Sequence, residues 1–335
     1  MPTVTLAHGN GGLRMRELID DVFASRLANE YLNTNNDAAF LNLDGERWAM
    51  TTDGFTVQPL FFPGGNIGSL AVHGTVNDLA VSGAKPFYLS LNAFIEEGTE
   101  FSQLEKIIDA MALAATAANI HIVTGDTKVV PNGNGGGVYF ATTGIGKRVK
   151  QLMLDDTRIQ AGDAIIASGP IGNHGIAVMM AREDFGLSTN ILSDSGNVWP
   201  LVNALCSLAT PAHIKLLRDP TRGGLNMVVQ DWNRTTHIGI DLFEQALPIE
   251  PAVQSVCNIL GYDAFNLACE GRIIAVVDAR TADSVCSRWK NLREGKGTAI
   301  IGRFTSHHSR VVMNTKMGGA RVLLPLEDEP LPRIC

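Results

Sequence analysis

The stretch NIGSLAVHGTVNDLAVSGAKPFYLSLNAF, residues 66–94, contains the pattern that decides the fold. From Asn66 to Ser82 the apolar residues recur at helical spacing, and Gly83 ends the predicted helix. Pro86 then opens an apolar run that is typical of a β-strand. A helix followed directly by a strand predicts a layered protein in which helices cover a sheet.

The same alternation continues on both sides of this stretch. Upstream, residues 13–27 have helical spacing, and the strand-like runs 38–43 and 47–52 flank the turn dipeptide Asp44-Gly45, which predicts a β-hairpin. Downstream we expect a helix that starts with a capping box at Ser102 and Glu105, and then a strand, a turn and another strand. The helix is predicted at residues 102–119, the first strand at 121–124, the turn at 125–128 and the second strand at 137–146.

A polar, charged stretch from Lys147 to Asp156 marks the predicted domain boundary. Beyond it, strands are predicted in residues 164–169, 239–243, 272–277 and 298–304, and helices in residues 197–208, 223–235 and 251–261. At 335 residues the chain exceeds one typical core. We therefore predict an α/β (α+β) protein with domains at 1–150 and 151–324, each a sheet covered by helices, and a flexible tail at 325–335.

Composition excludes several classes of function. Lys and Arg number 27 against 34 Asp and Glu, a net charge of -7, and no basic run marks a nucleic-acid groove. The N-terminus lacks the pattern of a signal peptide, and no apolar segment approaches the length of a membrane span. We expect a cytoplasmic protein without nucleic-acid or membrane partners.

The five cysteines are odd in number and include no CxxC pair, which argues against a disulfide framework and a zinc site. We expect most of them to be buried. Cys335 differs, because it is the last residue of a Pro-rich, acidic tail, and an exposed terminal thiol is open to oxidation unless it has a use.

Four acids follow or precede predicted elements of the first domain: Asp37, Asp53, Asp78 and Asp126. Carboxylates that converge in this way hold Mg²⁺, and the glycines of residues 8–12 let a backbone approach phosphate before a helix N-terminus. The plain alternative is that Asp and Gly simply populate turns. The chain has no Walker A loop and no GxGxxG after a strand, so any ATP site follows another scheme.

These pieces occur in an order that resembles the PurM-like ATP-binding superfamily. They are HGNGG (8–12), DAAF (37–40), TTDG (51–54), VNDLAVSGAKP (76–86), TGDTKV (124–129), DPTRGG (219–224) and ACEG (268–271). The terminal PRIC (332–335) resembles the hydrogenase maturation branch of that superfamily. The resemblance covers essentially the whole chain.

The resemblance implies a homodimer formed by the N-terminal domains, with Mg-ATP at the interface. The implied metal ligands are Asp37, Asp53, Asp78 and Asp126. The implied ATP contacts are Gly9, Asn10, Gly11, Gly12, Asn77, Asp78, Asp126 and Lys128.

The resemblance also implies a reaction. A carbamoyltransferase, HypF, places a carbamoyl group on the terminal cysteine, and ATP-dependent dehydration turns it into a protein thiocyanate. The cyano group then passes to a HypC-HypD iron scaffold and becomes a cyanide ligand of the nickel-iron hydrogenase centre.

The chemistry of that reaction gives roles to particular side chains. Cys335 carries the group, and phosphorylation lets the carbonyl oxygen leave as phosphate. Glu270 is the first candidate for the base that takes protons from nitrogen, and Lys128 is placed to steady phosphoryl oxygens or developing charge. Arg222 suits orientation of the tail carboxylate or a phosphate, while Asp219 is read as a turn or capping acid. We leave His8 and His73 out of the catalytic set, since a lone histidine near glycines or on a helix is more often structural or exposed.

Two other classes remain open. One is a small-molecule enzyme of the same superfamily, such as aminoimidazole ribonucleotide synthetase, thiamine-monophosphate kinase or selenophosphate synthetase. Selenophosphate synthetase would normally carry a reactive Cys or selenocysteine near its N-terminal glycines, whereas the first cysteine here is Cys206. The other class is a scaffold that binds a metallocentre assembly through its thiol without catalysis.

Overall fold

The computed structural model describes residues 12–27, 29, 35–36, 38–133, 136–183, 185–186 and 190–326. The sequence-predicted residues Gly9, Asn10, Gly11, Asp37 and Cys335 lie outside this part of the chain. Within it, no helix is both long and apolar enough to cross a membrane.

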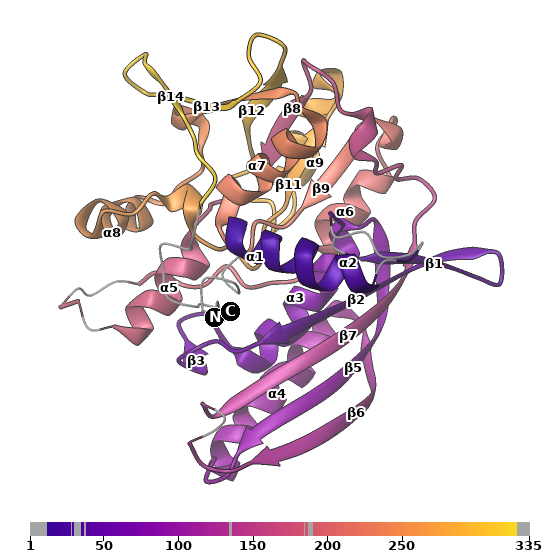
Figure 1. Ribbon diagram of the computed structural model, residues 1–335, viewed down its shortest axis with the longest axis vertical. Helices are drawn as coiled ribbons and strands as arrows, with labels where there is room; N and C mark the ends of the chain where they lie inside the picture. Colours follow the sequence, from indigo (N-terminus) through magenta and orange to yellow (C-terminus); the bar gives the residue numbers. More distant parts are fainter. Residues whose placement is uncertain are drawn as a thin grey trace.

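The first sheet has the strand order β1-β2-β7-β5-β6, and only β5 and β6 run parallel. Helices α3 (Ile67–Val81) and α4 (Phe101–Ala118) pack against one face of this sheet (Figure 1). The strands span Ala39–Leu43 (β1), Glu46–Phe55 (β2), Val138–Arg148 (β7), Ala84–Glu96 (β5) and His121–Val130 (β6). A two-stranded pair, β3 (Phe61–Phe62) and β4 (Gly65–Asn66), precedes α3.

The predicted hairpin is confirmed. Leu43 pairs with Glu46 across a two-residue turn, in which Asp44 has φ 51° and Gly45 has φ 75°. Two consecutive left-handed residues match the strand twist, which is why Asp-Gly favours this turn.

The helix predicted from residue 66 is also confirmed. Asn66 caps α3 by accepting from the backbone N–H groups of Gly68 and Ser69 at 2.8 and 3.2 Å. Nearly every residue of α3 is buried, because the helix lies between its own sheet and the second half of the molecule. Gly83, with φ 75°, follows its end.

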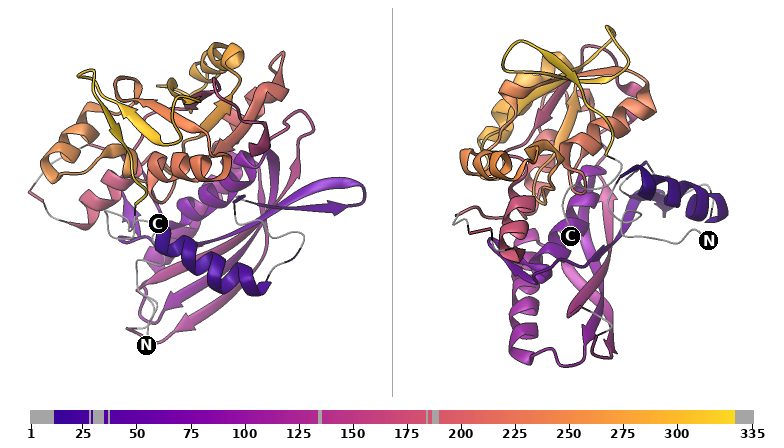
Figure 2. Two further views of the ribbon diagram at one scale, coloured as in Figure 1. Left: turned by 45° about the horizontal axis from the view of Figure 1, so that its top comes forward. Right: turned by 60° about the vertical axis from the view of Figure 1, so that its left-hand side comes forward.

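The second sheet has the order β14-β13-β10-β12-β8-β11-β9. Alternate residues of β8 face two separate cores: Ile165 packs with α7, whereas Ile166 packs with α6 and α9. Figure 2 shows this sheet between its helices, above the first sheet. Its strands are β8 (Ala164–Ala167), β9 (Ile214–Arg218), β10 (Gly239–Phe243), β11 (Ile274–Val277), β12 (Ala299–Thr305), β13 (Val311–Asn314) and β14 (Ala320–Val322). Its helices are α5 (Asn173–Arg182), α6 (Trp199–Cys206), α7 (Gly224–Thr236), α8 (Pro251–Leu260) and α9 (Ala282–Lys290).

The N-terminal helical segment crosses between the two halves. It consists of α1 (Leu13–Leu18), a π-helical turn (Ile19–Ala24) and α2 (Ser25–Leu27). Arg16 of α1 forms an ion pair of 3.0 Å with Asp231 of α7, which ties this segment to the second half.

Two local predictions were wrong. Residues 125–128 form no turn but lie inside β6, where Gly125 lets the backbone approach the carbonyl oxygen of Leu91. The capping box at Ser102 is also absent, since α4 begins one residue earlier with Glu100 as its N-cap and no side-chain cap bond.

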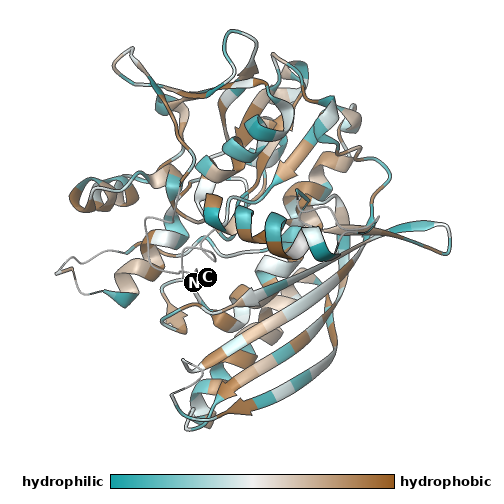
Figure 3. Ribbon diagram, in the orientation of Figure 1, coloured by the Kyte–Doolittle hydropathy of each residue, from teal (hydrophilic) through white to brown (hydrophobic). Residues whose placement is uncertain are grey.

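The face of the first sheet opposite α3 and α4 carries exposed apolar side chains. Met50, Tyr88, Phe94 and Ile145 are each between 38% and 45% exposed. Apolar residues recur along these strands (Figure 3). We call the set Met50, Tyr88, Phe94 and Ile145 the outer-face patch.

Candidate functional site

An acidic cavity of about 270 Å³ lies where α1, β2, α3 and α7 meet the loops before α7 and β11. Its wall carries the carboxylates Asp53, Asp78, Asp219 and Glu270 together with Arg222. Five of the residues predicted from sequence, Gly12, Asp53, Asp78, Arg222 and Glu270, are therefore brought together from both halves of the chain.

Contacts between β2 and α3 position Asp53 and Asp78, the two acids that the first half contributes to the cavity. Thr51 Oγ1 donates to Asp78 Oδ2 at 2.9 Å, which links β2 to α3. Gly74 of α3 faces Asp53, since a Cβ there would lie 3.6 Å from Asp53 Oδ2 and 2.8 Å from the ring of Phe55. The missing side chain lets the helix approach the strand, and this brings Asp53 and Asp78 to the same cavity.

Burial and like charge control the ionisation of the cavity. Burial raises the pKa of Asp53, against the opposing effects of the Arg222 charge and the Gly54 N–H. Burial also holds the pKa of Glu270 well above its ordinary value, and the negative charges of Asp219, Asp53 and Asp194 add to the effect. Arg222 opposes it. The cavity contains more acidic than basic side chains, and a bound cation would offset the repulsion between their negative charges.

The donor set of this cavity suits a hard cation that prefers carboxylate oxygens. In the part of the chain that the structure describes, no three His, Cys, Asp or Glu side chains are grouped tightly enough to form a metal site. The predicted ligand Asp37 lies outside those residues. Asp53, Asp78 and Asp219 in the cavity wall supply the carboxylate oxygens that Mg²⁺ prefers, but these described residues do not by themselves form a closed metal site.

Asp126 and Lys128 do not reach this cavity within one chain. They form an ion pair of 2.7 Å on β6 with side chains 58% and 62% exposed, and the hydrogen bond from Lys128 lowers the pKa of Asp126. Asp126 pairs with Asn92 of β5, whose side chain is exposed on the outer face of the sheet. Asp53 lies on the other face, which packs against α3. Three strand spacings separate β2 from β6, about 14 Å.

The loop before α7 needs glycine at two positions. Gly223 and Gly224 have φ 71° and 58°, and a Cβ on Gly224 would lie 2.5 Å from the carbonyl oxygen of Leu267. This tight junction puts Thr221 and Arg222 into the cavity wall, directly before the N-terminus of α7.

Sequence reasoning missed Asp219 and Asp194. Asp219 is only 7% exposed and lines the cavity beside the acids that were predicted there. It directly follows the strand β9, which was not among the predicted strands, so its place at a strand end could not be recognised from the sequence. Asp194 has no such pattern, and only the tertiary fold brings it to Glu270.

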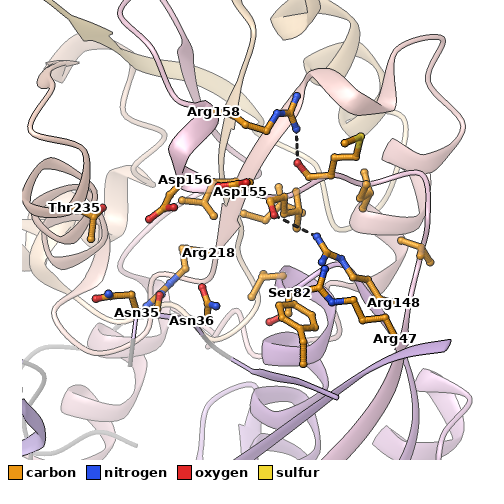
Figure 4. Close-up of a pocket in the computed structure, with 18 of the residues that line it drawn as sticks. Asn35, Asn36, Arg47, Ser82, Arg148, Asp155, Asp156, Arg158, Arg218 and Thr235 are labelled. Atoms are coloured by element: carbon orange, nitrogen blue, oxygen red, sulfur yellow. Dashed lines mark hydrogen bonds between the residues drawn. The ribbon is translucent and has the colours of Figure 1, made fainter. Parts of the chain in front are cut away.

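A larger cavity of about 630 Å³ adjoins the first, and the two share Arg16, Asn36, Arg218 and Asp231. The guanidinium groups of Arg47 and Arg148 both lie against the Phe40 ring, at 4.7 and 4.8 Å from its centroid. Figure 4 shows both arginines on one side of the cavity and Arg218 on the other. We call it the arginine cavity.

Two arginines of this cavity, Arg148 and Arg158, donate to backbone carbonyl oxygens. Arg148 donates to the carbonyl oxygen of Leu154 at 3.3 Å, and Arg158 donates to those of Met153 and Ala212. The pKa of Arg148 is lowered, first by burial and then by the positive charge of Arg47. Positive charge in surplus, in a cavity of this size, favours an anionic organic ligand.

The last described residues are fixed beside the acidic cavity. The carbonyl oxygens of Leu323 and Leu324 accept hydrogen bonds from Gln230 and Asn226 of α7, at 2.9 and 3.2 Å. The carbonyl of Leu326 accepts from the backbone N–H of Leu13 in α1 at 3.2 Å. Since residues of α1 and α7 also line the acidic cavity, the described part of the chain ends close to that cavity, nine residues before Cys335.

Asn77, predicted to contact ATP, is not among the residues that line either cavity. It is 1% exposed, and its side-chain amide bonds to the backbone of three residues from the second half of the chain: Gly196, Val198 and Glu270.

Comparison with known proteins gives the same architecture. Residues 35–148 match the family described as AIR synthase related protein, N-terminal domain, and residues 160–314 match the corresponding C-terminal domain. The carbamoyl dehydratase HypE of Bradyrhizobium diazoefficiens is 42% identical over 333 residues, 99% of this chain and 96% of that protein.

Solved structures agree. A chain in the crystal structure of a HypE-HypF complex superposes with a TM-score of 0.87 at 41% identity, covering 92% of this chain and 99% of that one. A HypE crystal structure in complex with ATP superposes with a TM-score of 0.81 at 38% identity, covering 99% of this chain and 100% of that one.

Proposed function

Because this chain belongs to the AIR synthase related proteins, and within them to the HypE carbamoyl dehydratases, we propose that it dehydrates an S-carbamoyl group on its own Cys335 with ATP. The product is a protein thiocyanate that supplies the cyanide ligand for nickel-iron hydrogenase assembly. A single observation carries the assignment to this site: α1 and α7, which line the acidic cavity, also hold residues 323–326.

The reaction balances as one phosphoryl transfer and one elimination. The carbonyl oxygen of Cys335-S-C(=O)-NH₂ takes the γ-phosphoryl group of ATP and ADP leaves. The C–O bond then breaks, phosphate departs with that oxygen, and the nitrogen loses two protons to give S-C≡N. Phosphorylation is needed because oxide or hydroxide is a very poor leaving group, whereas phosphate is a good one.

Glu270 is the described residue best placed to take a proton from that nitrogen. It is buried in the cavity wall, and burial raises its pKa, which makes its carboxylate a stronger base than an exposed one. Arg222, in the same wall, suits orientation of the tail carboxylate or a phosphoryl oxygen.

ATP fits across the two joined cavities. The arginine cavity, with about 630 Å³ and a surplus of guanidinium groups, suits the nucleotide. The γ-phosphate then extends toward Asp53 and Asp78, past the shared residues Arg16 and Arg218. Mg²⁺ held by these carboxylates would neutralise the phosphate charge and offset the repulsion among the acids.

We propose a homodimer built on the outer-face patch. Exposed apolar side chains on one face of the sheet, three of them cross-strand neighbours (Met50, Ile145 and Tyr88) and Phe94 farther along β5, favour a self-complementary interface. Asp126 and Lys128 pair with Asn92 and Phe94 on the same outer face, so we place them at this subunit interface and not in the acidic cavity, which lies on the α3 side of the sheet.

The partners follow from the reaction. A HypF carbamoyltransferase donates the carbamoyl group, and a HypC-HypD iron scaffold accepts the cyano group. The solved HypE-HypF complex of a relative supports the first of these partners. Residues 327–335 extend to about 30 Å at about 3.3 Å per residue, long enough to present Cys335 to the cavity and then to a partner.

The test is ATP hydrolysis measured with carbamoylated and uncarbamoylated protein. We expect turnover only with the carbamoylated chain and none with Cys335→Ala. The alternative small-molecule enzymes would be indifferent to Cys335→Ala, and a scaffold would show no carbamoyl-dependent hydrolysis. The whole-chain identity of 42% to a carbamoyl dehydratase favours the first result.

A further inference from the structure

We infer that Asn77 is a positioning residue that holds Glu270 in the acidic cavity, a role that rests on the proposed function. Asn77 Nδ2 donates to the carbonyl oxygens of Glu270 and Gly196, both at 3.0 Å. Its Oδ1 accepts from the backbone N–H of Val198 at 2.9 Å. One side chain of the first half thus fixes two loops of the second.

The main chain of Glu270 is held from the opposite side as well. The carboxylate of Asp194 accepts from the backbone N–H groups of Glu270 and Gly271 at 3.4 and 3.3 Å. It also accepts from the N–H of His174 at 3.1 Å. Both backbone polar groups of Glu270 are therefore fixed, its N–H by Asp194 and its C=O by the Asn77 amide at 3.0 Å and the Gly196 N–H at 3.3 Å.

The junction leaves no room for adjustment. A Cβ on Gly271 would lie 1.9 Å from the carbonyl oxygen of Asp194, so the two segments are in direct backbone contact. One turn before Asn77 on α3, His73 Nδ1 lies 2.9 Å from Ser195 Oγ, which adds a second link to the same segment. These contacts join α3 firmly to residues 193–198.

The place of Asn77 on α3 connects its hydrogen bond with Glu270 to a second carboxylate of the cavity. The next residue is Asp78, which lines the acidic cavity from the same helix. The bond from Asn77 to Glu270 therefore fixes the distance between a carboxylate of the first half and the proposed base of the second. An error of about 1 Å in such a distance lowers a rate about 100-fold.

A direct nucleotide contact by Asn77 is less compatible with these bonds. Its two amide hydrogens and one oxygen lone pair are all in use, and the residue is 1% exposed. The two roles predict different kinetics, because a lost nucleotide contact raises the KM for ATP, whereas a displaced base lowers kcat.

The test uses full-length, carbamoylated protein with Asn77→Ala and Asn77→Asp. Asn77→Asp keeps the volume but cannot donate to the two carbonyl groups. We expect both variants to lose about tenfold to 100-fold in kcat for dehydration, with the KM for ATP within about twofold of normal. A raised KM with normal kcat, or normal values for both, would overturn the inference.

Thr75→Val is the matched control. Thr75 is fully buried in the same helix and bonds to Thr142 of its own sheet, away from Glu270. We expect this variant to keep normal kcat even where its melting temperature falls. An equal loss of kcat in Thr75→Val would mean that any weakening of α3 has the same effect, and the specific role of Asn77 would be rejected.

A double-mutant cycle separates this inference from the proposed function. If Asn77 acts through Glu270, the loss caused by Asn77→Ala shrinks at least fivefold when measured in Glu270→Asp protein. Full additivity would contradict a role through Glu270. Normal dehydration by Glu270→Gln would remove the base itself, whereas stalled Glu270→Gln with normal Asn77 variants would remove the positioning role alone.

Discussion

Asp53 of β2 and Glu270 of the loop before β11 line the same cavity, and the negative charge of Asp53 contributes to the raised pKa of Glu270. One residue belongs to each half of the protein, so the electrostatics of the site depend on how the halves are joined. This relationship supports the proposal that a cation and a base act in one cavity.

Glu270→Gln should stall dehydration while leaving carbamoylation intact. The amide keeps the size of the side chain but cannot accept a proton from the carbamoyl nitrogen, and loss of a general base lowers rates about 100-fold to 10,000-fold. Mass spectrometry of the C-terminal peptide measures this directly. The variant should retain the carbamoyl mass, and the usual loss of one water would reject Glu270 as the base.

Asp53→Asn should stabilise the metal-free protein and abolish its activity. Burial raises the pKa of Asp53, so the ionised carboxylate destabilises the folded protein. Replacement by Asn removes this penalty, and the gain in stability therefore grows as the pH rises and more of the carboxyl group would be ionised. At pH 7 without Mg²⁺ we expect the melting temperature to rise by about 2 °C, with a smaller gain at pH 5. A lower melting temperature at pH 7 would contradict the electrostatic account.

Arg47→Ala should weaken ATP binding. Its guanidinium lies against Phe40 in the arginine cavity, and removal of one such charge raises the KM for ATP about tenfold with little change in kcat. Arg288→Ala is the control, since Arg288 is exposed on α9. Equal KM values in the two variants would remove the arginine cavity from the nucleotide site.

Phe94→Glu should turn a dimer into a monomer. Phe94 is 41% exposed in the outer-face patch, and a charge in a self-complementary apolar interface is repeated by the symmetry. Light scattering after size exclusion measures the mass. Leu113→Glu, at a 72% exposed site on α4, should keep the dimer, and a Phe94→Glu protein that stays dimeric would place the interface elsewhere.

His73→Gln should reduce the loss in the free energy of unfolding that occurs as the pH falls below 6.5. Burial lowers the pKa of His73 to about 4, so the unfolded chain binds more protons than the folded one between pH 6.5 and 4. Stability is therefore full above pH 6.5 and falls by at most about 1.4 kcal/mol per pH unit below it. Denaturant titrations at pH 7 and pH 5 measure the effect, with the exposed His121→Gln as control; equal pH dependence in both variants would contradict it.

The sequence predicts well the features that depend on neighbouring residues. The Asp44-Gly45 turn needs only two left-handed residues, and the α3 cap needs only Asn66 and the next few N–H groups. The buried cysteines follow from composition, since Cys257, Cys269 and Cys286 are all buried. Each of these outcomes is fixed by local geometry or hydrophobicity.

Features that depend on distant contacts were beyond reach. Asp219 looks like a turn residue until β9 places it opposite Asp53, and Asn77 looks like a polar motif residue until residues 193–198 pack on α3. The motif around Asp126 resembled a turn, but pairing with β5 extends it into a strand. Long-range strand pairing and loop packing determine where these three residues lie, and neither can be read from a short window of the sequence.

The most direct measurement follows the oxygen of the carbamoyl group. Cys335 carrying a carbamoyl group labelled with ¹⁸O is mixed with Mg-ATP for a single turnover in unlabelled water, and the inorganic phosphate is analysed by mass spectrometry. The account predicts one ¹⁸O atom in the phosphate for each thiocyanate formed, because the oxygen leaves bonded to phosphorus. Label released into water, with unlabelled phosphate, would contradict it.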